Sequence, residues 1–166
     1  MKNFICIFLS FVILAAGCGV TDDTEGNVVV GDRLPHFAVT LSDGAIVTDA
    51  DLLGKVNLIA FFTVTCPDCQ ETLPELQKIY DRYSKQISVL LISRAEDYEV
   101  VMPYWKENGF TMPVSPQKNR SVYELFAKSI VPRVYICSRD NVVKAIHTDS
   151  PNPTYDEMSE EIKSLL

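Results

Sequence analysis

Positive charge is scarce in this sequence. Of its 166 residues, 15 are lysine or arginine and 22 are aspartate or glutamate, which gives a formal net charge of −7. A nucleic-acid-binding domain normally presents a basic patch, so this balance argues against nucleic acid as a partner. The chain has no internal repeat or low-complexity tract, and its 47% of hydrophobic residues argues against a disordered chain. Its length suits a single domain with a sizeable core.

The N-terminal hydrophobic run is too short for a comfortable membrane span. It covers residues 4–16, whereas a spanning helix needs ~20 residues, but after the positive start Met1-Lys2-Asn3 it is typical of a secretory signal. Its end, Leu14-Ala15-Ala16-Gly17-Cys18, resembles a bacterial lipobox, in which a cysteine after small residues is lipidated. We therefore predict a lipoprotein signal peptide over residues 1–17, a lipid on Cys18, a flexible tether over residues 18–30 and one domain over residues 31–166. An ordinary signal peptide cleaved nearby is the alternative.

Cysteine and histidine are also few. If Cys6 leaves with the signal and Cys18 takes the lipid, the five cysteines leave three thiols, at positions 66, 69 and 137. These thiols would lie outside the cytosol, where disulfides can persist. The chain has one CxxC motif and two isolated histidines, so a four-ligand zinc site has few candidates and we predict no metal. Cys137 is expected to fill the core within a strand.

Strand and helix patterns alternate along the chain. Residues 55–63 and 87–92 are near-continuous apolar runs, which mark strands buried on both faces. A helix should begin at Cys66-Pro67, because proline is favoured at the first helical position. Two more helix starts are predicted by capping-box patterns, at Ser93–Glu96 and Ser121–Glu124. The last helix is expected to start at Thr154–Glu157. The other expected elements are a hairpin around Asp43-Gly44 and strands at 111–114, 133–137 and 142–147. This order predicts an α/β fold with helices on both faces of the sheet.

The sequence Cys66-Pro67-Asp68-Cys69 stands where the strand of residues 55–63 hands over to a helix. A thiol in the first turn faces free N–H groups and the positive end of the helix dipole, which favours the nucleophilic thiolate. The spacing also brings the second sulfur within disulfide reach. We therefore predict Cys66 as the nucleophile and Cys69 as the resolving thiol, with a redox-active Cys66–Cys69 disulfide and no other cofactor. A structural disulfide or half of a zinc site are the alternatives.

A larger pattern surrounds this motif and resembles one family. Its parts are Gly31-Asp32-Arg33-Leu34-Pro35-His36-Phe37, Asp43-Gly44, Leu53-Gly54-Lys55-Val56, Phe61-Phe62, the CxxC motif, Leu73-Pro74-Glu75-Leu76, and Ile130-Val131-Pro132-Arg133-Val134-Tyr135-Ile136 with Asp140-Asn141. Over roughly residues 31–166 the chain resembles the exported thioredoxin-like proteins called TlpA/ResA-type disulfide reductases. The resemblance implies a thioredoxin-like fold, with a central mixed sheet flanked by helices, an N-terminal β-hairpin and a central α/β insertion.

The resemblance also implies a function and its site residues. The protein would be a thiol–disulfide oxidoreductase that reduces disulfides of exported proteins. Pro132 would follow a cis peptide bond beside the cysteine pair, and the backbone of Val131 would pair with a substrate segment like an added strand. Pro67 and Asp68 would also contact the substrate. A membrane-associated or thioredoxin-like donor would supply electrons, and the protein would be lipid-anchored in a bacterial cell envelope, on the periplasmic face or at the outer membrane.

The chain departs from the family pattern around the cysteines. Thr65 replaces the usual tryptophan before the first cysteine, and Ala60 replaces a buried acid found in many thioredoxins. Thr72 stands where ResA-like members carry a glutamate, so the proton acceptor for the second thiol is left open between Glu71 and water. A carboxylate at Asp68 repels a thiolate at Cys66 and destabilises the reduced form, which favours a reductant over an oxidant.

Two other functions fit parts of the pattern. Peroxiredoxins place a threonine three residues before their cysteine, as Thr63 is here, but they also need a proline where this chain has Ile59. Sco-type copper chaperones carry a similar motif with one more residue between the cysteines, plus a distant histidine. His147 would then be a third ligand for Cu(I), which prefers soft thiolates. Peroxide consumption and copper titration separate these alternatives from the reductase.

Overall fold

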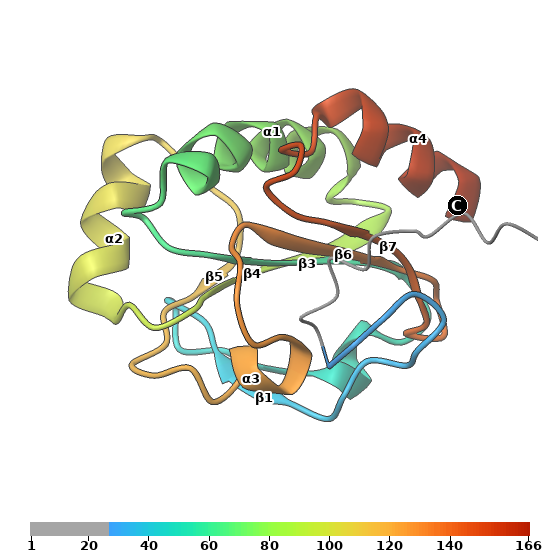
Figure 1. Cartoon of the computed structure of the whole chain (residues 1–166), viewed down its shortest axis with the longest axis horizontal. Helices are drawn as coiled ribbons and strands as arrows, with labels where there is room; N and C mark the ends of the chain where they lie inside the picture. The colour runs from blue at the N-terminus through green and yellow to red at the C-terminus, as the bar shows by residue number, and fades with distance from the viewer. Residues whose placement is uncertain (1–26) are drawn as a thin grey trace, which may run out of the picture.

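The computed structural model describes residues 27–166 (Figure 1). The predicted signal peptide at 1–17, the lipidation site Cys18 and most of the tether at 18–30 lie outside the described residues. Asn27 and Val28 already pack on the domain, because their amides donate to the carbonyl of Phe126 at 2.9 and 3.1 Å. These two contacts tie residues 27 and 28 to the helix α3 (Tyr123–Phe126) of the domain. No helix within residues 27–166 combines the length and apolar character needed to cross a bilayer.

A five-stranded mixed sheet forms the centre of the molecule. Its strands are β3 (Val56–Phe62), β4 (Ile87–Ser93), β5 (Val114–Ser115), β6 (Arg133–Cys137) and β7 (Val143–His147), in the spatial order β5-β4-β3-β6-β7. β3, β4 and β5 run parallel, whereas β6 and β7 are antiparallel to their neighbours. Every residue of β3 is buried, as expected for a central strand covered on both faces.

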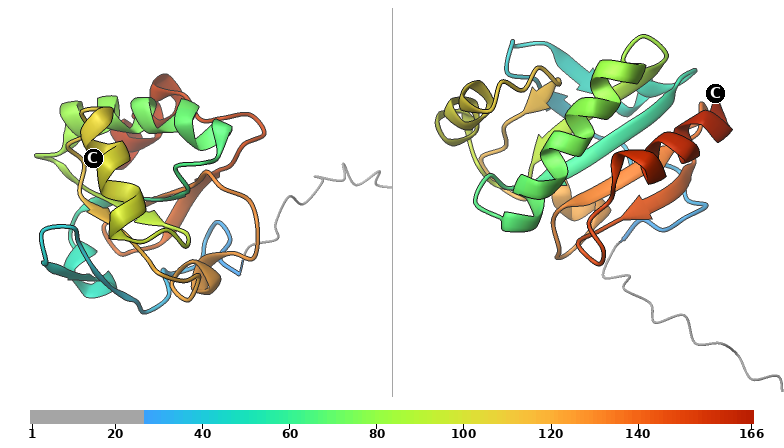
Figure 2. Two further views of the ribbon diagram at one scale, coloured as in Figure 1. Left: turned by 90° about the vertical axis from the view of Figure 1, so that its left-hand side faces the viewer. Right: turned by 90° about the horizontal axis from the view of Figure 1, so that it is seen from above.

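Helices cover both faces of this sheet, as the sequence predicts. Figures 1 and 2 show α1 (Pro67–Tyr83) and α4 (Tyr155–Leu165) on one face, and α3 (Tyr123–Phe126) on the other. The second face also carries the 3-10 helix η1 (Asp49–Leu52) and the hairpin of β1 (Ala38–Thr40) and β2 (Ile46–Thr48), which is the predicted N-terminal hairpin. α2 (Tyr98–Glu107) lies beside the β5 edge and forms, with β5, the central α/β insertion.

Successive side chains of β3 build different parts of the core, because neighbouring residues of a strand point to opposite faces. The ring of Phe61 packs against Tyr123 and Phe126 of α3, with centroids 5.3 and 4.9 Å apart. The ring of Phe62 packs instead against Trp105 of α2 at 5.1 Å. The strand that leads to the cysteine motif is therefore fixed from both sides.

The predicted helix starts had different outcomes. The last helix, α4, starts where predicted, and Thr154 and Glu157 form a capping box there. The prediction at Ser93–Glu96 was wrong, because Ser93 pairs with Phe62 as the last residue of β4 and α2 begins only at Tyr98. The pattern at 121–124 also makes no side-chain cap, since α3 starts at Tyr123 with Val122 before it. The short strand expected at 111–114 is displaced to β5 at 114–115.

Candidate active site

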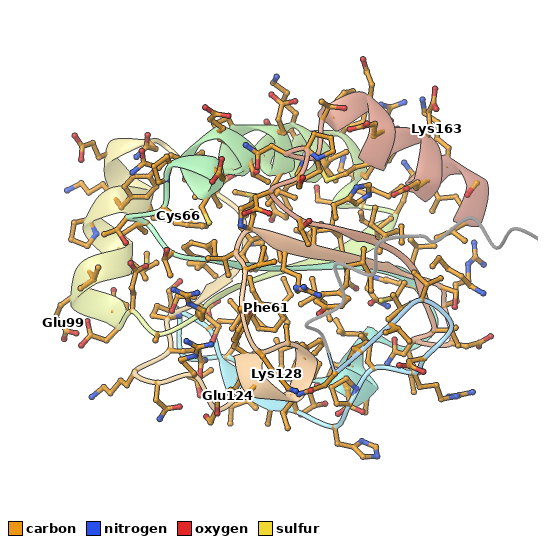
Figure 3. All side chains as sticks on the ribbon, in the orientation of Figure 1. Phe61, Cys66, Glu99, Glu124, Lys128 and Lys163 are labelled. Carbon is orange, nitrogen blue, oxygen red and sulfur yellow. The ribbon has the colours of Figure 1, made fainter. Side chains whose placement is uncertain are left out.

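Cys66 stands at the start of α1, where the chain leaves the buried strand β3. It is the N-cap residue, with extended backbone angles (φ −86°, ψ 122°), and Pro67 follows at the first helical position. Its amide donates to the carbonyl of Thr63 at 3.4 Å. Cys66 is partly exposed, and Figure 3 shows it at the α1 terminus on the side of the molecule that carries α2. Cys66 therefore lies between a strand and a helix, where the sequence predicts it.

Cys69 lies one turn further along α1 and is fully buried, with 0% of its surface exposed. Both cysteines are free thiols. Burial raises the pKa of the Cys69 thiol far above its usual range, and the neighbouring Cys66 raises it further. A hydrogen bond with the Thr63 backbone and the positive charge of Arg94 oppose this shift without cancelling it. Cys69 therefore stays protonated at neutral pH until another group removes its proton.

The loop before β6 brings a backbone carbonyl to Cys66. The Cys66 thiol donates to the carbonyl oxygen of Val131 at 3.4 Å, and the Val131–Pro132 peptide bond is cis. The loop reaches this position because β6 pairs antiparallel with β3, with Arg133 opposite Phe61. Residues far apart in the sequence, the cysteine motif and the Val131–Pro132 pair, thus meet at one end of the sheet.

Two side chains that the sequence analysis did not select hold the turn before Cys66. The carboxylate of Glu96 accepts the amide of Val64 at 2.7 Å and the hydroxyl of Thr65 at 3.4 Å. Gln70 of α1 donates to the carbonyl of Val64 at 2.8 Å. Glu96 belongs to the pattern that was interpreted as a helix cap, so its role in the turn could be seen only once the fold had brought it there.

Asp68, between the cysteines, is bound by a loop near the C-terminus. The side-chain amide of Asn152 donates to Asp68 at 3.3 Å and to Glu71 at 3.1 Å. The hydroxyl of Thr72 donates to the backbone carbonyl of Asp68 at 2.8 Å and is buried. The glutamate position of ResA-like proteins is therefore filled by a hydroxyl that is occupied within its own helix. The sequence does not predict this contact of Asn152 with the cysteine motif. The prolines on either side of Asn152 are the one local sign that its loop is ordered.

With this geometry established, the chain can be placed among known proteins. It matches the AhpC/TSA family over residues 30–146, more than half of its length. The chain belongs to the AhpC/TSA family.

This AhpC/TSA member is similar to curated proteins named thiol-disulfide oxidoreductase ResA. It is 26% identical over 150 residues to ResA of Oceanobacillus iheyensis, covering 87% of this chain and 78% of that protein. It is 23% identical over 160 residues to ResA of Geobacillus kaustophilus, covering 93% and 91% of the two chains. The predicted resemblance to ResA-type proteins is confirmed.

Solved structures confirm the fold of this AhpC/TSA member. A thiol:disulfide interchange protein of the thioredoxin family from Chlorobium tepidum matches it with a TM-score of 0.71 at 18% identity, covering 82% of this chain and 97% of that one. A thio-disulfide isomerase from Thermus thermophilus matches with a TM-score of 0.68 at 21% identity, covering 83% and 97%. The predicted thioredoxin-like fold is therefore correct.

Cys137, His147 and His36 make their contacts with other parts of this AhpC/TSA member. Cys137 is fully buried in β6, and burial raises its pKa to about 12. His147 contacts Glu161 of α4 at 2.8 Å, and His36 contacts Asp49 at 2.9 Å. Among residues 27–166, no three His, Cys, Asp or Glu side chains gather into a group that could hold a metal ion. His147 thus contacts Glu161, whereas the copper-chaperone hypothesis needs it as a ligand beside Cys66 and Cys69.

Proposed function

We propose that this protein reduces disulfides of other exported proteins by cycling between a Cys66–Cys69 dithiol and a Cys66–Cys69 disulfide. The chain is a thiol–disulfide oxidoreductase, and the proposal adds the direction of the reaction and the role of each residue. The observation that carries it is the asymmetry of the pair. Cys66 is partly exposed at a helix start beside the Val131 carbonyl, while Cys69 is fully buried one turn deeper. A structural disulfide gives no reason for this asymmetry.

The first step is attack by the Cys66 thiolate on one sulfur of the substrate disulfide. The substrate S–S bond breaks as a Cys66–substrate S–S bond forms, and the other substrate sulfur leaves as a thiolate that takes up a proton. Cys66 is the nucleophile because it is the cysteine that solvent and substrate reach. Cys66 is the N-cap of α1, so its sulfur stands beside the free N–H groups of the first helical turn.

The second step releases the reduced substrate. Cys69 loses its proton and attacks Cys66, which forms the Cys66–Cys69 disulfide and expels the second substrate thiolate. Two electrons have then passed to the substrate, and a membrane-associated or thioredoxin-like dithiol donor must return them. The raised pKa of Cys69 makes its deprotonation the demanding part of this step. Glu71 is held by Asn152, which supports water as the proton acceptor.

The substrate would bind as an extended segment along the loop at Val131. Val131 precedes the cis-peptide-linked Pro132 and contacts Cys66, so a backbone that paired with Val131 would bring its cysteine to the nucleophile. Pro67 is exposed and Asp68 partly exposed beside Cys66, which supports both as further contacts. We also propose cleavage after residue 17, a lipid on Cys18 and attachment to a membrane of the bacterial cell envelope, on the strength of the N-terminal sequence.

A trapping experiment tests this assignment. In a Cys69→Ser variant the second step is blocked, so substrates should stay joined to Cys66 and be released by dithiothreitol. The full chain, expressed with its signal in a bacterial host, would be captured under denaturing conditions after free thiols are alkylated. The matched control is the Cys66→Ser, Cys69→Ser double variant, which should retain nothing.

Each alternative outcome of the trapping experiment has a meaning. Equal captures by the single and double variants would contradict the proposal, as would a single variant with no dithiothreitol-releasable partner. Rapid consumption of hydrogen peroxide by Cys66 of the wild-type chain, without reduction of protein disulfides, would instead support the thiol peroxidase alternative.

A further inference from the structure

The loop that brings Val131 to Cys66 is unusual in its backbone. This loop, residues 128–132 and hereafter the proline loop, joins α3 to β6. Ile130 within it has a φ of 66°, in the left-handed region that β-branched side chains rarely adopt. Such a conformation persists only where surrounding groups hold it. The groups that hold Ile130 therefore also decide where Val131 stands relative to Cys66.

Tyr123 supplies the main contact with the proline loop. Its hydroxyl lies within hydrogen-bond distance of the backbone carbonyls of Ser129 and Ile130, the second at 2.8 Å, and shares its single proton between them. The guanidinium of Arg120 donates to the carbonyl of Lys128. The carbonyls of three successive loop residues, 128, 129 and 130, thus accept hydrogen bonds from Tyr123 of α3 and from Arg120 just before this helix.

The ring of Tyr123 is itself fixed from several sides. It is 1% exposed and meets the edge of Phe61, with centroids 5.3 Å apart at 76°. Figure 3 shows Phe61 between the sheet and α3. The guanidinium groups of Arg94 and Arg120 lie 5.9 and 5.4 Å from the centre of the ring. Because the ring is held by packing and by cation–π contacts, its hydroxyl is a fixed point for the loop.

A buried positive charge stands next to this hydroxyl. Arg133, the first residue of β6, is 1% exposed, and no ion pair joins it to a carboxylate of residues 27–166. Burial raises the pKa of Tyr123, while the charge of Arg133 and its hydrogen bond to the hydroxyl oppose that rise. The hydroxyl therefore keeps its proton at neutral pH, and the adjacent cation polarises it toward the loop carbonyls.

We propose that Tyr123 is a positioning residue for the thiol–disulfide reaction. Its hydroxyl fixes the proline loop so that the backbone of Val131 stands beside Cys66, ready to pair with the extended segment of a protein substrate. Tyr123 acts through the loop and touches neither sulfur. The inference rests on the proposed pairing of substrate with Val131, and it names the residue that keeps the pairing edge in place.

The test compares two conservative variants on two kinds of disulfide. Tyr123→Phe removes the hydroxyl and keeps the ring. The control Tyr135→Phe removes an equally buried hydroxyl that also neighbours Arg133 but donates to Phe126 at 3.2 Å rather than to the proline loop. The probes are insulin, whose disulfides lie in a polypeptide, and the small aromatic disulfide DTNB, which has no backbone to pair. Losing the loop contact should raise KM for insulin about five- to tenfold, with kcat and the DTNB rate nearly unchanged. Tyr135→Phe should leave both rates near those of the wild-type chain.

The pattern of losses decides between positioning and general loosening. A similar loss of insulin reduction in Tyr123→Phe and Tyr135→Phe would overturn the positioning role. A Tyr123→Phe protein whose rates with insulin and with DTNB decrease by the same factor would overturn it too. So would an unchanged KM for insulin in a Tyr123→Phe protein that folds normally by circular dichroism. A wild-type chain that reduces neither probe would overturn the proposed function itself, which is a different result from an active wild type with an unaffected variant.

Discussion

Cys69 and Cys137 are alike in burial and unlike in surroundings. Both have no exposed surface, and burial raises the pKa of both thiols. The pKa of Cys69 is also changed by Cys66, the Thr63 backbone and Arg94, whereas burial is the one cause of the raised pKa of Cys137. Cys137 is the last residue of β6 and lies opposite Asn57, at the end of β3 that is remote from Cys66. The comparison shows that burial alone does not distinguish the two thiols, and that a more exposed neighbouring thiol, Cys66, acts on Cys69 but not on Cys137. In the proposed mechanism this neighbour is what draws Cys69 into the redox reaction.

The largest expected effect is the difference between removing Cys66 and removing Cys137. Cys66→Ser should lower insulin reduction at least ~1,000-fold, because the attacking sulfur is gone. Cys137→Ala should leave the rate per folded molecule nearly unchanged. Turnover of insulin by the two purified proteins measures both. Comparable losses in the two variants would mean that Cys137 belongs to the redox centre, contrary to its place in the sheet.

A second, smaller effect concerns stability at high pH, where the two buried thiols should behave alike. Since the folded pKa of Cys137 is about 12 and its ordinary value is 9.0, the unfolded chain loses this proton first as pH rises. The stability that the buried thiol contributes is complete below about pH 9 and decreases toward pH 12, by at most ~1.4 kcal/mol per pH unit. Cys69 acts in the same direction, because its folded pKa is also raised.

Denaturant unfolding of the reduced protein at pH 7.5 and pH 10 measures this loss. Cys137→Ala should be less stable than the wild-type chain at pH 7.5, by ~1 kcal/mol for the atoms removed from the core. It should also lose less stability between the two pH values, because one of the two titrating thiols is absent. A pH dependence identical to that of the wild-type chain would show that Cys137 keeps no raised pKa.

Sequence patterns could predict the parts of the site that depend on local order. The apolar run of residues 55–63 and the proline after Cys66 are enough to place a thiol between a buried strand and a helix, because both act within a few residues. Pro132 was placed beside the cysteines by resemblance, and the antiparallel pairing of β3 with β6 explains why it lies there.

The parts that could not be predicted come from contacts between distant segments. Glu96 reaches Val64, and Asn152 reaches Asp68, only after the sheet has brought their loops to one end. Ser93–Glu96 has the local pattern of a helix cap, but pairing of Ser93 with Phe62 keeps it in β4. Nothing in the sequence marks Tyr123 as a site residue, because a tyrosine within a helix-start pattern is typical of a core side chain. Tertiary pairing decided all of these positions.

The smallest expected effect concerns the charge of Asp68, for which Cys137 has no counterpart. It tests whether this charge lowers the reduction potential of the Cys66–Cys69 pair. Asp68 is partly exposed, so water screens its repulsion of a Cys66 thiolate to ~0.5–1 kcal/mol. Asp68→Asn removes that repulsion, stabilises the reduced state and should raise the reduction potential of the pair by ~10–20 mV. Equilibration with glutathione redox buffers, read by alkylation of Cys66, measures the shift.

Glu71→Gln is the matched control, because Asn152 binds Glu71 as well as Asp68 but Glu71 lies outside the motif. The reduction potential of this variant should stay within a few millivolts of the wild-type value, since Glu71 is exposed and water and salt screen its charge. An equal rise in both variants would assign the effect to Asn152 and its loop rather than to the charge of Asp68. A wild-type potential near that of a strong oxidant, about −120 mV, rather than near the thioredoxin value of about −270 mV, would contradict the reducing direction, because electrons would then flow from substrate thiols to this pair.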